Sequence, residues 1–290
     1  MPAAVTTAKS FKLCIVFVCC ICIIFSCNAS INTKPGAPVK KAAATTATSS
    51  QNIYANKHKV IHVFVALCDN LHQGIEPVPK GIGNGQNPAT NRYWGCDYGV
   101  KAWFKNKASW KLVTTIANPA QHILERCIFK DPVTGAYMVA DAYNGAYIKQ
   151  TMADFLNAMA GVTAATIVSG SDTLGIAGNA AMVAYIGHEG LMDVSLDSFP
   201  AQHDTRKRDA VILACESKQY WYRIMQKSGA NPLLWTTELM CPEAYTLNAA
   251  VTGWLNNETA KQIHLRASQA YSKYQNCPLK AAANLLATGY

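Results

Sequence analysis

The 290-residue chain has few charged side chains and lacks the motifs of several common enzyme classes. Its charged residues make up 15%, and the cysteines beyond residue 27 form no Cys-x-x-Cys pair. A His-Glu-x-x-His sequence is also missing, so we predict no metal and no cofactor. No Gly-x-Gly-x-x-Gly, Walker or Gly-x-Ser-x-Gly pattern occurs. These absences argue against a phosphate-binding loop and a serine-hydrolase elbow.

The formal charge of +9 is concentrated at one end of the chain. Seven lysines and no acidic residue precede residue 60, whereas the remainder of the chain contains 19 basic and 17 acidic residues. The high net charge is therefore weak evidence for nucleic-acid binding. No nucleic-acid motif is present, and we predict no nucleic-acid partner.

The N-terminal segment has the layout of an export signal. Lys9 and Lys12 precede an apolar run over 13–25, which has the length of a secretory signal rather than of a membrane span. The run ends next to Cys27, which resembles a bacterial lipoprotein signal. We predict a signal peptide over 1–26, lipidation of Cys27 and attachment to a bacterial membrane through this lipid. An ordinary signal peptide or an uncleaved anchor is the alternative.

A change of composition separates a tether from a folded domain. Residues 27–56 are rich in Ala, Thr, Ser, Lys and Pro and show no apolar periodicity, which is typical of a disordered tether. The stretch 57–290, about 230 residues, is long enough for one sizeable core. Its short apolar runs alternate with helical patterns. This predicts one α/β domain with a mostly parallel sheet and helices on both faces.

The expected elements of this domain follow from those patterns. Strands are predicted over 60–67, 111–116, 123–129, 136–143, 181–186, 210–214 and 233–237, and helices over 93–104, 146–160, 218–227, 245–255, 258–274 and 279–287. Long loops are predicted over 71–91 and 169–178.

The strongest chemical signal follows two of these strands. The strand over 181–186 is followed by Gly-His-Glu-Gly with His188, and the strand over 210–214 by Cys215. Because ligands of an open α/β sheet bind beyond the carboxyl ends of its strands, these two side chains are placed to meet. A thiolate is a strong nucleophile, and an imidazole can take the proton from the thiol. A cysteine that is only packed in the core is the alternative.

This layout resembles the catalytic core of the caspase, legumain and gingipain group of cysteine peptidases. The run Ala-Cys-Glu-Ser at 214–217 is similar to that of legumain-type enzymes, and the resemblance covers about residues 180–218. It implies a caspase-like three-layer α/β/α fold in which Cys215 is the nucleophile and His188 the base. The two residues are 27 positions apart, a shorter gap than the family's.

The resemblance also implies roles for neighbouring residues. Glu189 stands where the family usually has a glycine, so Gly190 is the expected oxyanion donor together with the Cys215 amide. A residue after the first strand, Asp69 or Asn70, is expected to orient the imidazole. A helix that starts near the nucleophile is expected to lower the thiol pKa. Four acidic residues near the strand ends are expected to contact a peptide or protein substrate: Glu189, Asp193, Glu238 and Glu243.

Two functions are compatible with these patterns. The first is an exported, membrane-anchored cysteine hydrolase, most simply a peptidase. The second is a non-catalytic envelope lipoprotein that uses the same fold to bind a peptide, a glycan or a protein. A free Cys215 close to His188 favours the enzyme, whereas a buried Cys215 or a disulfide to Cys241 favours the binding protein.

Overall fold

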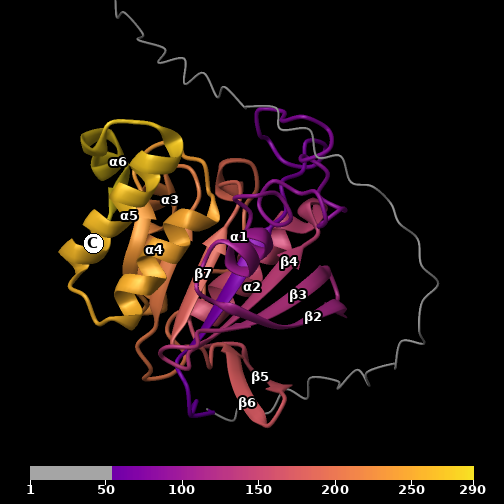
Figure 1. Cartoon of the computed structure of the whole chain (residues 1–290), viewed down its shortest axis with the longest axis vertical. Coiled ribbons are helices and arrows are strands. Elements are labelled where there is room, and N and C mark those ends of the chain that lie inside the picture. The colour runs from indigo at the N-terminus through magenta and orange to yellow at the C-terminus, as the bar shows by residue number, and fades with distance from the viewer. Residues whose placement is uncertain (1–53) are drawn as a thin grey trace, which may run out of the picture. The chain divides into compact units, whose positions relative to one another are not determined.

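The computed structural model describes residues 54–290 and has an eight-stranded sheet at its centre (Figure 1). The strand order is β10-β9-β8-β7-β1-β4-β3-β2. The run from β9 to β4 is parallel, and the antiparallel pairings lie toward the two edges. The predicted α/β class with a mostly parallel sheet is thus confirmed. The strands of this sheet are β1 (Val60–Ala66), β2 (Lys111–Ala120), β3 (Ile123–Lys130), β4 (Tyr137–Tyr143), β7 (Met182–Ile186), β8 (Asp209–Leu213), β9 (Asn231–Thr236) and β10 (Leu286–Ala287).

Helices cover both faces of the sheet, which gives three layers (Figure 1). On one face α1, α4, α5 and α6 pack against Ile61, Val63 and Val65 of β1. On the other face α2 and α3 pack against Phe64 and Ala66. Successive side chains of a strand point to opposite faces, so the buried side chains of β1, apolar except for His62, serve both layers. The helices are α1 (Val100–Asn106), α2 (Ile148–Met159), α3 (Ser217–Ser228), α4 (Ala244–Leu255), α5 (Ala260–Gln275) and α6 (Leu279–Leu285), with short 3₁₀ turns η1 (Gly145–Tyr147) and η2 (Gly190–Met192).

The helix predicted over 93–104 is wrong in its first half. Helix α1 begins only at Val100, and a compact turn precedes it. The Asn91 carbonyl accepts hydrogen bonds from the amides of three successive residues, 94, 95 and 96, at 3.0–3.1 Å. The apolar side chains in this turn are buried as helical ones would be, so their spacing suggested a longer helix.

The loop predicted over 169–178 is instead largely a β-hairpin. Strands β5 (Ala164–Ser169) and β6 (Asp172–Ala177) pair antiparallel, and Gly170 at the turn has a left-handed φ of 60°. Leu174 and Ile176 pack against the sheet. The second strand has only these two large apolar residues. The alternation of apolar and polar residues that indicates a strand was therefore weak in the sequence.

The folded domain begins a few residues before the predicted boundary at residue 57. The signal peptide, Cys27 and the tether as far as residue 53 lie outside the described residues. The tether's last residues, 54–56, bond to the folded part. The Tyr54 amide donates to Asn179 at 3.1 Å, and the Asn56 side chain accepts from the Gly175 amide at 2.6 Å. These residues therefore belong to the fold.

Candidate active site

Strands β7 and β8 are adjacent and parallel, as predicted, and their register places His188 beside Cys215. Ile186, the last residue of β7, pairs with Leu213, the last residue of β8. His188 and Cys215 each follow two residues after that pair. Neighbouring strands lie about 4.8 Å apart, so the backbones of the two residues leave the carboxyl edge of the sheet side by side.

The imidazole of His188 is held by Asp193. Its Nε2 lies 2.5 Å from Asp193 Oδ2, and the His188 carbonyl accepts a hydrogen bond from Tyr185 Oη at 2.7 Å. The same Asp193 oxygen accepts from the Gly74 amide at 3.1 Å, which joins the loop after β1 to this site. The imidazole is mostly buried. With Nε2 directed at a carboxylate, Nδ1 is the nitrogen left for proton exchange.

Asp69 and Asn70, which were expected to orient His188, bond within their own loop instead. Asp69 accepts hydrogen bonds from His72 Nδ1 at 2.9 Å and from Gln86 Nε2 at 2.6 Å. Asn70 bonds both the amide and the carbonyl of Val78, at 3.1 and 2.6 Å. Both side chains thus fix the long loop after β1. The carboxylate that bonds the imidazole is that of Asp193, which was expected to contact a substrate.

The thiol of Cys215 is free and half-buried. Its Sγ accepts a hydrogen bond from the Met240 amide at 3.4 Å and lies 3.6 Å from the Met240 carbonyl. Within residues 54–290, no hydrogen bond joins Sγ to His188. No disulfide joins Cys215 to Cys241, so this predicted alternative is not formed. The thiol instead contacts Met240 in the loop after β9.

The expected lowering of the thiol pKa is wrong. Burial raises the pKa of Cys215, and the nearby carboxylates of Glu189 and Glu216 raise it further, against a hydrogen bond from Met240 and the charge of Arg92. Helix α3 starts two residues later, after Glu216 in a left-handed conformation with φ 50°. The desolvation of the thiol therefore outweighs the helix terminus.

Glu189 is fully buried and bonds other residues of the protein, so it does not contact a substrate. Its carboxylate accepts hydrogen bonds from Trp221 Nε1 at 2.9 Å and from the Leu191 amide at 3.3 Å, and its exposed fraction is 0%. Trp221 belongs to α3, the helix that follows Cys215, so this contact ties the two loops of the site together. Burial raises the pKa of Glu189 to about 8, from its ordinary 4.5.

The loop after β9 and Arg92 form a wall beside Cys215 that the sequence did not reveal. Arg92 Nη2 lies 3.7 Å from Glu243 Oε1 and donates to Cys241 Sγ at 3.4 Å. Glu243 is mostly buried in this pair, so the structure does not support its expected role as a substrate contact. Glu238 is exposed and remains available to a substrate. Arg92 lies in a polar loop without periodicity, and no local pattern singled it out.

Several backbone amides around the dyad of His188 and Cys215 donate no hydrogen bond within residues 54–290, including those of His188 and Glu189. Among the hydrogen bonds of residues 54–290, none has the N–H of Gly190 or of Cys215 as its donor. A backbone donor without a partner is rare in a folded protein and is available to a ligand oxygen. These are the two amides that the sequence assigned to the oxyanion.

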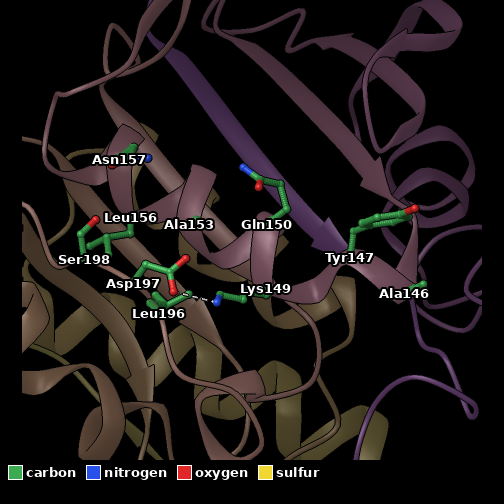
Figure 2. Close-up of a pocket in the computed structure, with 10 residues that line it drawn as sticks. All are labelled: Ala146, Tyr147, Lys149, Gln150, Ala153, Leu156, Asn157, Leu196, Asp197 and Ser198. Atoms are coloured by element: carbon green, nitrogen blue, oxygen red, sulfur yellow. Dashed lines mark hydrogen bonds and ion pairs between the residues drawn. The ribbon is translucent and has the colours of Figure 1, made fainter.

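The described residues also contain two cavities that lie away from the dyad. The first, of about 430 Å³, is lined by one side of α2 and by residues 196–198, with Lys149 and Asp197 joined across it at 2.9 Å (Figure 2). The second, of about 460 Å³, lies at the amino end of the sheet. Neither is lined by His188 or Cys215.

Comparison of the chain with protein-family models, with curated proteins and with solved structures found no match. Residues 54–290 contain no group of three or more His, Cys, Asp or Glu side chains arranged to hold a metal ion. Within the same residues, no helix is both long and apolar enough to cross a membrane.

Proposed function

We propose that the domain is a cysteine hydrolase, most simply a peptidase, with Cys215 as nucleophile and His188 as base. The observation that carries the proposal is the register of β7 and β8, which brings these two residues to the same point of the sheet edge. Three groups around them suit the chemistry: a carboxylate that bonds the imidazole, a free thiol and two unpaired amides.

In the proposed reaction, Cys215 Sγ bonds to the carbonyl carbon of a peptide while His188 Nδ1 takes the thiol proton. The Gly190 and Cys215 amides donate to the oxyanion. The C–N bond then breaks, and His188 passes its proton to the leaving amine. A water molecule, deprotonated by His188, attacks the thioester and releases the acid and the thiol. Because the thiol pKa is raised, proton transfer accompanies the attack instead of preceding it.

The second candidate, a non-catalytic binding protein, is favoured by the resting contacts of the thiol. Sγ contacts Met240 and makes no hydrogen bond to His188 among the described residues. In this case a peptide would occupy the same edge without forming a thioester. The two candidates differ in whether Cys215 reacts faster with a peptide-borne electrophile than with a simple alkylating agent.

Labelling of the full chain with a peptide that carries a thiol-reactive ketone tests the proposal. We expect Cys215 to be modified, with no modification in Cys215→Ala and a rate reduced about 100-fold in His188→Ala. Cys277→Ala is the matched control, because Cys277 is also a free, half-buried thiol. Equal rates for the wild type and His188→Ala, measured by mass spectrometry of intact protein, would contradict an enzyme and support the binding protein.

We also propose that the protein is exported and anchored to a bacterial membrane through a lipid on Cys27. The support is the sequence: two lysines, an apolar run and a cysteine at its end. Mass spectrometry of the mature protein should show an N-terminal diacylglyceryl cysteine at position 27. An intact residue 1, or a mature end well beyond Cys27, would contradict this proposal.

A further inference from the structure

The amino end of the parallel sheet carries a concave surface at the edge opposite the dyad. The segment that leads into β1 and the hairpin β5–β6 lie at this end, and the long loop after β1 lies at the other (Figure 1). A cavity of about 460 Å³ opens here, lined by residues 55–59, 179–181 and 206–207. We call this region the amino-end surface.

Positive charge dominates the amino-end surface. Lys57, Lys59 and Lys207 are exposed, and none of them takes part in an ion pair within residues 54–290. Lys59 Nζ lies 4.6 Å above the Trp254 ring and donates to Asn257 at 3.2 Å, so its cation is held in place by neutral groups.

Two of the neighbouring acidic groups are engaged by other cations, and a third, Asp209, accepts hydrogen bonds from the neutral side chains of Trp254 and Asn231 at 2.7 and 2.6 Å. Asp172 lies 3.6 Å from His58 and 3.7 Å from Lys130. Asp204 bonds the buried guanidinium of Arg208 at 2.9 Å. The three exposed lysines around the cavity therefore leave a local excess of positive charge, which attracts a multivalent anionic partner.

We propose that the amino-end surface docks onto a membrane with anionic lipid headgroups. The described chain begins on this surface at Tyr54, whose carbonyl accepts a hydrogen bond from Arg206 at 2.7 Å. Residues 27–53, which precede it in the proposed mature protein, contain three lysines and no acidic residue. A segment of that composition has affinity for the same anionic surface. The inference does not depend on the proposed hydrolase activity.

Acetylation of lysines in the full chain bound to vesicles tests the docking. Phosphatidylcholine vesicles with and without phosphatidylglycerol are compared, and modification is read at each lysine by mass spectrometry. We expect Lys57, Lys59 and Lys207 to be protected severalfold only on the anionic vesicles. The internal controls Lys80 and Lys280 are exposed at the opposite end and should react equally on both. Equal modification of the amino-end lysines on both vesicles would overturn the proposal.

A double variant and an inorganic phosphate arm separate a membrane surface from a small-anion site. In Lys57→Glu/Lys207→Glu, the protection of Lys59 by anionic vesicles should disappear, since each lysine near such a surface contributes about fivefold to binding. The control variant Lys80→Glu/Lys280→Glu has the same change of net charge and should retain the protection of Lys59. Inorganic phosphate alone should protect none of the three lysines. Protection by phosphate equal to that by vesicles, or persistence of protection in the amino-end variant, would overturn the docking.

Discussion

Among single residues, Glu189 couples the stability of the site most directly to pH. Its carboxyl group is fully buried under Trp221, and its pKa of about 8 lies above the ordinary 4.5. Below about pH 4.5 Glu189 is protonated in both the folded and the unfolded chain, and its contribution to folding stability is fully present. As the pH rises toward 8 the unfolded chain loses its proton first, so folding stability falls.

Glu189→Gln tests this coupling. Gln keeps an oxygen for the Trp221 and Leu191 donors but cannot ionise, so we expect the variant to lose much less stability between about pH 5 and about pH 9. The wild type should lose roughly 4 kcal/mol more than the variant over this range, by the pKa difference. Urea unfolding of both proteins at each pH measures the difference. Parallel pH profiles for the two would show that Glu189 is already ionised in the fold.

Asp193 has a different role, because it acts through the imidazole. Asp193→Ala removes the acceptor of His188 Nε2 and of the Gly74 amide, so we expect peptide-probe labelling of Cys215 to slow by about 10- to 100-fold. Labelling by a simple alkylating agent, which does not require an oriented imidazole, should slow much less. Asp197→Ala, four residues further on and largely exposed, is the control. Equal slowing of both reagents in Asp193→Ala would show that Asp193 only holds the loop in place.

At the scale of secondary-structure elements, three strands are joined by a buried polar network. Asp141 of β4 accepts two hydrogen bonds from Arg126 of β3, both at 2.6 Å, and lies 3.0 Å from His62 Nε2 of β1. Asp141→Ala would leave the guanidinium buried without a counter-charge. We expect a loss of about 3–5 kcal/mol in the free energy of unfolding.

Denaturant unfolding of Asp141→Ala measures this loss, and Asp97→Ala is the control. Asp97 forms an exposed pair with Lys107 at 3.4 Å, and its removal should change stability little. If the two variants had similar midpoints, the network would not be holding β1, β3 and β4 together.

The sequence predicted the strands buried on both faces well, and it also predicted the largely exposed β2 and its partner β3. Strands β1, β7, β8 and β9 are short apolar runs, and each was predicted within a few residues of its observed bounds. The hairpin β5–β6 was missed because much of it is exposed and its turn is rich in small residues. Within the site, the adjacency and parallel direction of β7 and β8 were predicted from the α/β pattern, but their register was not. Asp193 was recognised as close to His188 in sequence, but its contact with the imidazole was not predicted, because a loop whose path no periodicity specifies carries it there.

At the scale of the whole domain, the proposed catalytic residues and the exposed lysines of the amino-end surface lie at opposite ends of one sheet. His188 and Cys215 follow the carboxyl ends of β7 and β8, while Lys57 and Lys59 precede the amino end of β1. If the amino-end surface docks as proposed, the dyad faces away from the bilayer. A substrate would then approach from the aqueous side.

The pairing of Ile186 with Leu213 also makes the position of the dyad independent of the length of chain between the two strands. An insertion of two glycines after the exposed Ser198 should leave peptide-probe labelling of Cys215 unchanged, because the ladder still sets both ends. One extra residue within β8, after Val211, should abolish labelling, because a one-residue slip turns the following side chains to the other face. Fixed-gap motif searches are therefore poorly suited to detecting distant relatives of this site. The better criterion is a histidine and a cysteine at equal heights on neighbouring parallel strands, whatever number of residues separates them.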